Sequence, residues 1–537
     1  MDTIFYNGVI KTLDSAWPQV SAMAVKDGVV IALGSDEEML ALAGEETKKV
    51  DLGGKLAMPG FCDTHMHLLF YGSFVRRIDM TNAKSWEEIR QWCVEDAPKA
   101  REEKRWILGS CFNQDYWSDT RKMPDRHDLD AIADDVPIFL QRACGHIACL
   151  NTKALQVSGL WDERADTTKE TMDFGEDGLP NGYIRENTTS IPQAIFGNYS
   201  LEETKDLLEM ACKNALKKGI VQVHTDDFNI IGENDLEKNL QAFKELVEEG
   251  RLPIRVYEQI RFQHPDQLQQ FLDMGYKAKQ RIGRFKFGPI KLLNDGSIGS
   301  HSAALRQEYK NDPGVKGLSL FSDEELYQMY DLAQKNGYDV VTHCIGDASL
   351  EQVLQTVDKV IKKYPRPNWR HGVIHCQIMD AEQQDRFKKM NLVAYVQPIF
   401  VKADSNVVDD CVGPELAKQS YNWRRYIDMG VHMCGGSDCP VEPFDPLPNI
   451  YHAVTRKGSN GKPWYPENGV TLDEAVAMFT KEAAYASYEE DERGTLGVGK
   501  YCDMVVLDKN IYENDIEELL NTSVVMTVID GQIAYEK

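Results

Sequence analysis

The chain has 537 residues, of which 42% are hydrophobic and 27% charged, the composition of an ordinary globular protein. Its 85 acidic residues outnumber 60 basic ones, and the formal charge of −25 argues against nucleic acid and anionic membrane surfaces as partners. No apolar run reaches the roughly 18 residues that a membrane span needs. The length permits one large α/β barrel with an accessory domain.

The expected location is the cytoplasm. The first residues, Met1-Asp2-Thr3, lack the basic region and the apolar stretch of a secretory signal. The twelve cysteines show no compact spacing, which is typical of an intracellular protein with reduced thiols. A small molecule is the expected partner, with no nucleic acid and no membrane, and a homodimer is left open.

Both ends of the chain read as short β-strands separated by tight turns. Asp27-Gly28 and Asp530-Gly531 predict two-residue hairpin turns, because both turn positions need a positive φ. The expected strands are Ser21–Lys26, Val29–Gly34, Cys502–Leu507, Val524–Ile529 and Gln532–Tyr535. Since chain ends often lie close together, residues 1–55 and 485–537 are predicted to form one small β-sandwich domain. Two independent β extensions are the alternative.

Residues 56–484 are predicted to form a barrel domain. Ser200, Ser322 and Thr471 each stand three residues before a glutamate, which is the capping-box pattern of a helix start. The expected strands are Leu56–Cys62, Ile220–His224, Ile254–Ile260, Phe285–Lys291, Tyr338–His343, Gly372–His375, Leu392–Gln397 and Val431–Gly436. This pattern predicts an α/β fold of the (β/α)8 TIM-barrel type, with an open doubly wound sheet as the alternative.

The gap between the first two barrel strands is too long for one crossover helix. Residues 73–205 are therefore predicted to form a large insertion after strand 1, on the face where barrel enzymes bind substrate. The insertion contains a capped helix, Ser85–Lys104, then the aromatic stretch Asp115-Tyr116-Trp117, then an apolar strand, Val136–Leu140. We expect it to act as a lid or specificity region.

The sequence Pro59-Gly60-Phe61-Cys62-Asp63-Thr64-His65-Met66-His67 places two histidines two positions apart just after a strand. Side chains alternate along an extended chain, so both imidazoles point to one side. Two convergent neutral imidazoles are a natural pair of ligands for a divalent metal. Taken alone, the pair is equally consistent with two polar loop histidines.

Three further residues at strand ends extend this pattern. His343 and His375 each end an apolar strand, and their separation of 32 residues matches one βα repeat, so both should project from the same rim. Asp438 follows the last predicted strand. Four histidines and a carboxylate at equivalent strand ends predict a metal site assembled from distant parts of the chain.

Together these residues resemble the amidohydrolase superfamily of metal-dependent barrel hydrolases. The segments Asn7-Gly8, Asp27-Gly28 and Met58–His67 are similar to the usual N-terminal pattern of that family. Ile290–Ser300 and Gly145-His146 resemble the narrower branch, amidohydrolase family 3, that includes YtcJ-like proteins and N-substituted formamide deformylases. The resemblance implies a barrel, a small sheet domain built from both ends, and hydrolysis of a carbon–nitrogen bond. His301 departs from the residue more often found in that branch.

Lys291 ends an apolar strand on the same rim. A protonated ammonium is disfavoured beside divalent cations, whereas a neutral amine can take up CO2 and become an anionic carbamate. The resemblance implies that this carboxylated lysine bridges two metals. The alternative is a lysine that extends outward to solvent, as expected for Lys286.

Weaker candidates are proposed to contact substrate. They are His146, His224, Tyr116, Trp117, Asp295 and His301, together with Asp226 beside His224. Cysteines neighbour several predicted ligands, so a thiolate nucleophile or a zinc–thiolate site is conceivable. Because each cysteine lies only one or two positions from a ligand along a strand, packing into the barrel wall is the preferred interpretation for them.

The resulting prediction is a metal-dependent hydrolase that cleaves a non-peptide C–N bond, in an amide, formamide, urea or lactam, with a metal-activated hydroxide. His65, His67 and Asp438 are predicted to hold one metal, His343 and His375 a second, and Lys291 to bridge them. Asp438 is predicted to transfer the proton. Zinc is the first expectation, and iron, nickel, cobalt or manganese suit similar ligands. The alternatives are a mononuclear deaminase and a non-catalytic barrel that binds a small molecule.

Overall fold

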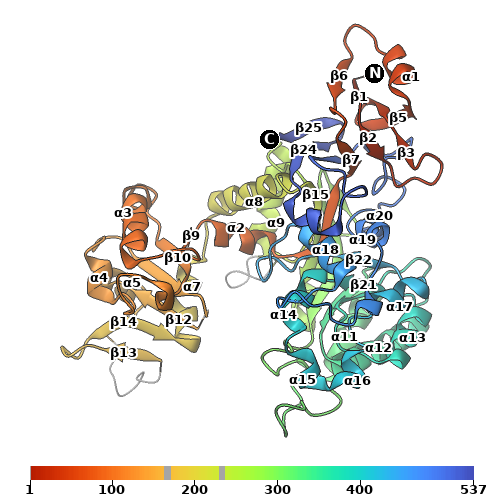
Figure 1. Ribbon diagram of the computed structural model, residues 1–537. Helices are drawn as coiled ribbons and strands as arrows, with labels where there is room; N and C mark the ends of the chain where they lie inside the picture. The colour runs from red at the N-terminus through yellow and green to blue at the C-terminus, as the bar shows by residue number, and fades with distance from the viewer. Residues whose placement is uncertain (1, 145, 163–170, 229–235) are drawn as a thin grey trace. The chain divides into compact units, whose positions relative to one another are not determined.

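The computed structural model describes residues 2–144, 146–162, 171–228 and 236–537. The chain divides into two compact units, each described by itself (Figure 1). The first comprises residues 1–68, 209–230 and 240–537, and it contains the barrel and a small β domain. The second comprises residues 69–208 and 231–239.

Eight parallel strands form the barrel sheet, in the order β22-β21-β20-β19-β18-β16-β15-β8. They are β8 (Phe61–Met66), β15 (Ile220–Thr225), β16 (Arg255–Arg261), β18 (Phe285–Leu293), β19 (Val340–Cys344), β20 (Gly372–His375), β21 (Val393–Val396) and β22 (Met433–Gly435). The two edge strands meet at their carboxyl ends, where the N–H of Asp438 donates to the carbonyl of His65 at 2.7 Å. The predicted (β/α)8 fold class is confirmed.

Helices follow the barrel strands and begin where the sequence predicts. Ser200, Ser322 and Thr471 each accept a hydrogen bond from the backbone of the glutamate three residues later. The principal helices are α8 (Leu201–Leu216), α9 (Leu236–Glu248), α10 (Pro265–Asp273), α11 (Asp323–Lys335), α12 (Asp347–Lys363), α13 (Ala381–Lys389), α17 (Trp423–Asp428), α18 (Pro446–Thr455), α19 (Leu472–Met478) and α20 (Lys481–Ala486). Within the described residues, no helix combines the length and hydropathy needed to cross a bilayer.

The prediction of one first barrel strand, Leu56–Cys62, is wrong, because the structure forms two separate strands over this segment. β7 (Leu56–Pro59) pairs with strands of the small β domain, and β8 enters the barrel immediately after Gly60. A side chain at Gly60 would approach Cγ1 of Val221 to 2.4 Å, so only glycine fits at this crossing. The barrel strand therefore runs further than predicted, and His65 lies within it.

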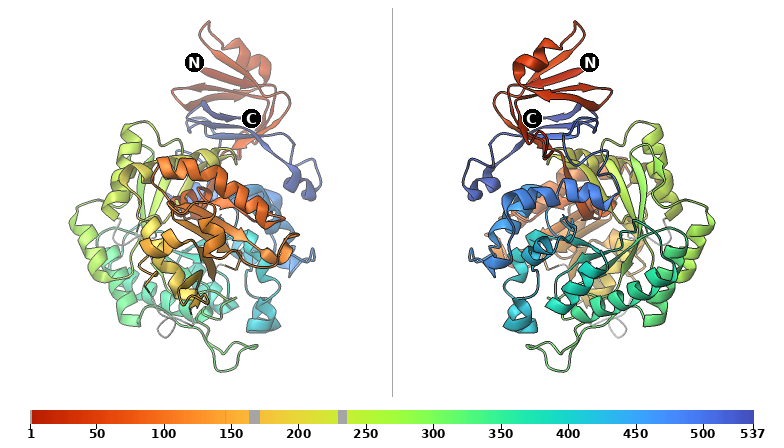
Figure 2. Two further views of the ribbon diagram at one scale, coloured as in Figure 1. Left: turned by 90° about the vertical axis from the view of Figure 1, so that its left-hand side faces the viewer. Right: turned by 90° about the vertical axis from the view of Figure 1, so that its right-hand side faces the viewer.

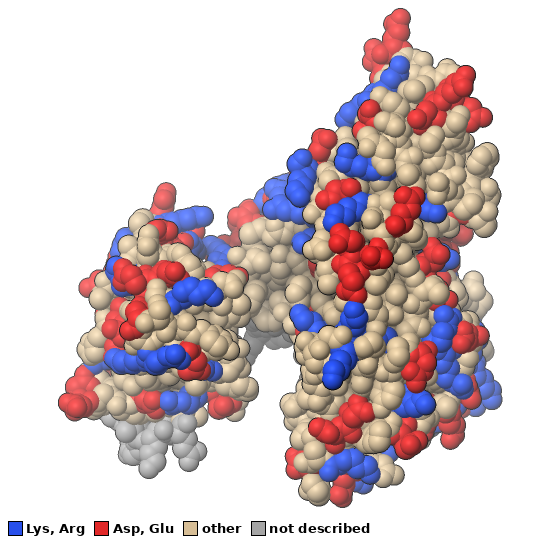
Figure 3. All heavy atoms as spheres, viewed as in Figure 1, with Lys and Arg blue, Asp and Glu red and all other residues tan. Residues whose placement is uncertain are grey.

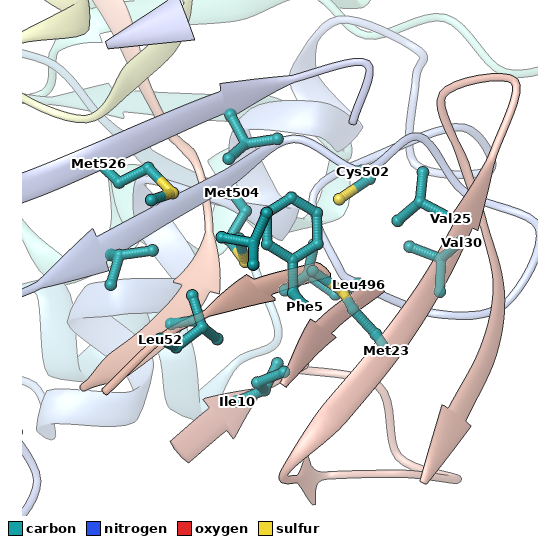
Figure 4. Close-up of a cluster of buried hydrophobic side chains, with 14 of the residues drawn as sticks. Phe5, Ile10, Met23, Val25, Val30, Leu52, Leu496, Cys502, Met504 and Met526 are labelled. Carbon is teal, nitrogen blue, oxygen red and sulfur yellow. The ribbon is translucent and has the colours of Figure 1, made fainter. Parts of the chain in front are cut away.

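Strands from both chain ends build the small β domain (Figure 2). One sheet has the order β5-β4-β1-β6 and the other β25-β24-β23-β7-β2-β3. Their bounds are β1 (Thr3–Tyr6), β2 (Val9–Lys11), β3 (Gln19–Val20), β4 (Ala22–Lys26), β5 (Val29–Gly34), β6 (Lys48–Asp51), β23 (Met504–Leu507), β24 (Val524–Ile529) and β25 (Gln532–Glu536). Figure 4 shows side chains from both ends, including Phe5, Met23 and Met504, packed into one hydrophobic core.

The second unit has its own six-stranded sheet, in the order β13-β14-β12-β11-β10-β9. Its strands are β9 (Ile78–Asp79), β10 (Ile107–Phe112), β11 (Ile138–Arg142), β12 (Ile147–Leu150), β13 (Met172–Phe174) and β14 (Pro180–Arg185). The predicted capped helix is present as α3 (Trp86–Glu102), with Ser85 as its N-cap. Buried clusters around Ile138 and Phe139 give this unit a core of its own.

Charged side chains of both signs are interspersed on the face drawn in Figure 3. Exposed acidic groups of the chain form ion pairs such as Arg101 with Asp135 and Lys362 with Asp358. The net charge of −25 is therefore spread over the chain rather than gathered into one acidic surface on this face.

Candidate metal centre

Three of the predicted ligands converge at the closure of the barrel. Asp438 Oδ1 lies 3.2 Å from Nε2 of His65 and 3.0 Å from Nε2 of His67. Candidate ligand atoms of these three residues all lie within 4.8 Å of one another. His65 is held in the strand β8, and Asp438 follows β22, which is the neighbouring edge of the same barrel.

The other predicted ligands lie close by. Nε2 of His375 is 2.8 Å from Nδ1 of His343, and the rings of His65 and His375 have centroids 5.7 Å apart. Lys291 is buried, with its Nζ 3.3 Å from Nε2 of His65 and 3.5 Å from Oδ2 of Asp226. The structure thus brings together all six residues that the sequence predicts as a metal site.

Buried side-chain oxygens engage the Nδ1 atoms of three of these histidines. Oε1 of Gln259 lies 3.1 Å from Nδ1 of His65, and Oε1 of Gln397 lies 2.7 Å from Nδ1 of His375. Nδ1 of His67 contacts a carboxylate oxygen of Asp226. A neutral imidazole has one N–H and one lone pair, so an acceptor at Nδ1 places the lone pair on Nε2.

His343 has the opposite arrangement. Its Nε2 lies 3.3 Å from the carbonyl oxygen of Gly296 and 3.4 Å from Oδ1 of Asp295, so its lone pair is on Nδ1. The two ring nitrogens that face each other across 2.8 Å, in His343 and His375, therefore both carry lone pairs. Two lone pairs repel at this distance, whereas a cation bound by both removes the repulsion. The donor set fits a divalent metal.

The electrostatics of the centre also favour a cation. Burial lowers the pKa of His65, His375 and His343, the last to about 3, so these imidazoles are neutral and available as ligands. Burial opposes a charge on His67 as well, but Asp226 and Asp438 outweigh it and raise its pKa to about 10. The carboxylates of Asp226 and Asp438 therefore favour a positive charge at or next to the His67 ring.

The backbone at two of these residues is strained. His375 has φ +81° and Asp438 has φ +60°, the left-handed region that residues with a side chain rarely adopt. Asp63 fixes the backbone around these residues. Its carboxylate accepts hydrogen bonds from the N–H of His65, at 3.1 Å, and from both the N–H and the hydroxyl of Ser437. The hydrogen bonds of this buried carboxylate join β8 to the segment that carries Asp438.

Two of the predicted substrate contacts lie in the barrel but are buried. Asp295 accepts hydrogen bonds from the N–H groups of Ala304, Ile345 and Gly346, at 2.8–3.1 Å. Its oxygens are thus engaged by the backbone and by His343, and a contact between Asp295 and substrate stays a prediction. His224 is fully buried in the barrel wall with its ring 4.8 Å from that of Tyr257.

His301 lies on the long loop after β18. Its Nδ1 is 2.9 Å from Oδ2 of Asp312, and its ring packs on that of Tyr309 with centroids 4.6 Å apart. Its side chain remains partly exposed. The contact between His301 and substrate stays a prediction.

The remaining three predicted substrate contacts belong to the second unit. Tyr116 is 75% exposed, and His146 is an exposed residue whose Nδ1 lies 3.1 Å from Glu186. Trp117 is instead buried in the core of this unit, with its ring 5.7 Å from that of Phe112. This core position gives the indole of Trp117 a packing role, and its contact with substrate stays a prediction.

The cysteines near the centre pack as the preferred interpretation expects. Cys62, Cys376, Cys434 and Cys439 are buried free thiols. Burial raises the pKa of each of these thiols, which keeps them protonated and disfavours both a thiolate nucleophile and a zinc–thiolate site.

Sequence reasoning missed Gln259 and Gln397. Both are buried, and their amide N–H groups donate to the carbonyls of Thr64 and Tyr395, which fixes the orientation of the amide oxygens. A signal for them exists in the sequence, because each is a polar residue at the end of an otherwise buried barrel strand.

Comparison with known proteins agrees with this geometry. Residues 48–535 match the model of the amidohydrolase family. The chain is 30% identical to the "Putative amidohydrolase YtcJ" of Bacillus subtilis (strain 168), over 100% of both chains. It is 23% identical to the N-substituted formamide deformylase of Arthrobacter pascens, over 100% of this chain and 98% of the relative.

A solved structure is similar over nearly the whole chain. It is an uncharacterized metal-dependent hydrolase from Pyrococcus horikoshii OT3, with a TM-score of 0.78 and 27% sequence identity, covering 96% of this chain and 99% of its own. An α/β barrel with convergent histidines and an aspartate at its strand ends defines the class as a metal-dependent hydrolase. This chain belongs to the amidohydrolase family, and the predicted resemblance is confirmed.

Proposed function

We propose that this protein hydrolyses a non-peptide C–N bond of a small molecule, of the amide, N-substituted formamide, urea or lactam type, at a metal centre formed by the six predicted residues. The observation that carries the proposal is the convergence of four imidazole rings and the carboxylate of Asp438. The relative named as a formamide deformylase supports the choice of bond.

His65, His67 and Asp438 would hold one divalent cation, and His343 and His375 a second. The neutral imidazoles and one carboxylate suit zinc first, and iron, nickel, cobalt or manganese next. When bound, such cations supply Lewis acidity, which polarises the scissile carbonyl and lowers the pKa of a water molecule.

Lys291 would bridge the two cations as a carbamate. Burial lowers the pKa of its amine, which raises the fraction of the neutral form that can react. The amine nitrogen attacks the carbon of CO2, so that an N–C bond forms while one C=O π bond opens and leaves its electron pair on oxygen, and the nitrogen then loses one proton to solvent. The product would be an anion with two oxygens, formed on the Nζ that lies 3.3 Å from Nε2 of His65 and 3.5 Å from Oδ2 of Asp226.

Asp438 moves the proton in this proposal. Its carboxylate accepts a proton from the attacking water as the oxygen–carbon bond forms, and it returns that proton to the nitrogen as the carbon–nitrogen bond breaks. Burial alone would raise the pKa of this carboxyl, but the neighbouring His65 and His67 hold that pKa well below its ordinary value, so Asp438 begins the cycle ionised. Asp226, Gln259 and Gln397 orient the imidazoles and hold their Nδ1 protons.

The proposed location is the cytoplasm. All twelve cysteines are free thiols, and ten of them are buried, which is the state expected in a reducing compartment.

The decisive experiment combines metal analysis with turnover. Protein purified without chelators should contain close to two divalent ions per chain, and it should hydrolyse at least one member of a panel of amides, formamides, ureas and lactams. One ion per chain together with release of ammonia from an aminated ring would favour the mononuclear deaminase instead. Metal without turnover of either panel would favour a binding protein.

A further inference from the structure

The ring of Phe400 stacks on the imidazole of a predicted metal ligand, His375. The two ring planes are nearly parallel, at 13°, and their centroids lie 5.9 Å apart. The lone pairs of an imidazole lie in the plane of its ring, so a stacked neighbour leaves them free. Phe400 therefore stands beside the metal centre without blocking the nitrogen of His375 that faces His343.

The local fold keeps Phe400 at this position. It ends the short turn η3 (Pro398–Phe400), which follows strand β21, and its N–H donates to the carbonyl of Gln397 at 3.1 Å. The first two residues of η3 and the following Val401 are buried, which anchors the turn. The side chain of Phe400, in contrast, is partly exposed. An apolar ring is thus held on a rigid turn with part of its surface open to solvent.

A second apolar side chain stands beside Asp438. Val441 is 65% exposed, and its N–H donates to the carbonyl of Asp438 at 2.9 Å. Asp438 follows β22, and β22 pairs in parallel with β21. The turns that carry Phe400 and Val441 therefore leave the barrel at neighbouring positions of one rim. Each presents an apolar side chain next to a residue of the predicted metal centre.

We infer that Phe400 and Val441 form an apolar subsite, which binds an aromatic group joined to the scissile carbon or nitrogen of the substrate. Small-molecule sites combine apolar and aromatic walls with a few polar groups that do the chemistry. A ring of the substrate gains both from burial and from offset stacking or edge contact with Phe400. The inference rests on the proposed function, because it names the class of substrate for that same site.

A purely structural role of Phe400 makes a different prediction. If the ring only held His375 in place, its removal would weaken metal binding and would affect every ligand of the centre alike. A subsite for the substrate instead changes the affinity for ligands that carry a ring. It leaves the metal content and the affinity for small ligands unchanged.

Isothermal titration of the metal-loaded, full-length protein compares two matched pairs of product analogues. Phenylacetate and acetate test for a ring on the carbonyl side, and phenylethylamine and ethylamine test for a ring on the nitrogen side. The titrations are repeated in Phe400→Ala and Val441→Ser. The controls are Trp17→Ala and Val498→Ser, which alter exposed apolar residues far along the chain from the predicted ligands. Metal content is measured for every variant.

In at least one pair, the wild type should bind the analogue with a ring about tenfold or more tightly than its small partner. Phe400→Ala should remove most of this preference, and Val441→Ser should reduce it about two- to threefold. Both controls should keep it. The affinity for the small partner and the metal content should not change in either subsite variant. The pair that shows the preference identifies the side of the scissile bond that carries the ring.

The inference is overturned if the wild type prefers neither analogue with a ring, if Phe400→Ala loses metal, or if Phe400→Ala weakens both members of a pair equally. These results are separate from failure of the proposed function. Hydrolysis of the substrate panel without any preference for a ring would reject the subsite and keep the hydrolase. The preference without hydrolysis of any member of the panel would reject the hydrolase and keep the subsite.

Discussion

The side-chain oxygen of Gln397 lies 2.7 Å from Nδ1 of His375, and this contact sets which nitrogen of His375 faces the centre. Gln397 follows strand β21 and His375 ends the neighbouring strand β20. The pair shows that adjacent barrel strands supply both a predicted ligand and the group that orients it.

Gln397→Leu should weaken metal binding by about 10–100-fold, because His375 loses the acceptor that holds its lone pair on Nε2. Gln397→Glu keeps an acceptor and should bind metal more tightly than Gln397→Leu does. The measurement is the free-metal concentration at half occupancy, in a competition titration with a chelator. Gln384→Leu, which removes a buried glutamine on α13, is the control. Equal metal affinity in Gln397→Leu and the control would contradict the proposed orientation.

His65→Ala or His67→Ala should remove metal and activity together. Each loses one of the converging nitrogen ligands beside Asp438, so the site becomes weak and catalysis is lost with the ion. Metal content by atomic emission and turnover of the best substrate are measured side by side. His264→Ala, at an exposed N-cap outside the centre, should match the wild type in both. Wild-type metal content in both His65→Ala and His67→Ala would contradict the assignment of these histidines as metal ligands.

Asp438→Asn should retain the fold and lower kcat by about 10²–10⁴-fold, the usual loss when an acid–base group is removed. The amide keeps the shape of the side chain but cannot accept and return a proton. Circular dichroism checks the fold and steady-state kinetics give kcat. A variant with normal kcat would mean that another group transfers the proton.

Lys291→Ala should bind the metal pair weakly and be nearly inactive, because the bridging anion is lost while the four histidines and Asp438 remain. A short carboxylate such as acetate or propionate should restore part of the activity by filling the gap. In the wild type, metal reconstitution of apo protein should be slow in CO2-depleted buffer and faster when bicarbonate is added. Indifference to bicarbonate, together with an unmodified amine in the mass spectrum of the native protein, would favour the mononuclear alternative.

Substitutions in the second unit should separate specificity from stability. Tyr116→Ala and His146→Ala should change the ratio of kcat/KM between substrates while metal content stays constant, because both side chains are exposed. Trp117→Ala should instead destabilise this unit by about 3–5 kcal/mol, the usual cost of deleting a buried tryptophan. Substrate panels and thermal unfolding measure the two effects. Equal loss on every substrate for Tyr116→Ala and His146→Ala would mean that the unit has no part in specificity.

The barrel and the cluster of predicted ligands could be predicted because each rests on a repeated pattern. An apolar strand followed by a histidine recurs at His343 and His375, and the carboxyl ends of parallel barrel strands meet at one rim. Capping boxes such as Ser322 with Glu325 marked the helix starts, because this local hydrogen-bond pattern depends on only four residues.

The features that the sequence could not supply have a common physical origin, which is that local sequence does not say which way a side chain points. Trp117 lies in a polar, aromatic stretch, yet its ring packs inward. Asp295 belongs to a loop rich in small residues, and only the fold brings to its carboxylate one N–H group of that loop and two from the segment after β19. The break between β7 and β8 at Gly60 depends on a contact with Val221, which lies 161 positions further along the chain.

Closure of the barrel has a consequence for how the protein is made. The hydrogen bonds between Asp63 and Ser437 join residues 374 positions apart. On a ribosome, β8 leaves the exit tunnel long before its second neighbour exists, and pairings so distant in sequence are slow to form. The nascent chain must therefore keep the β8 edge unpaired through most of its synthesis. A variant destabilised at the contact between Asp63 and Ser437 should therefore need chaperones for folding more strongly than a variant of equal stability that is altered elsewhere in the barrel.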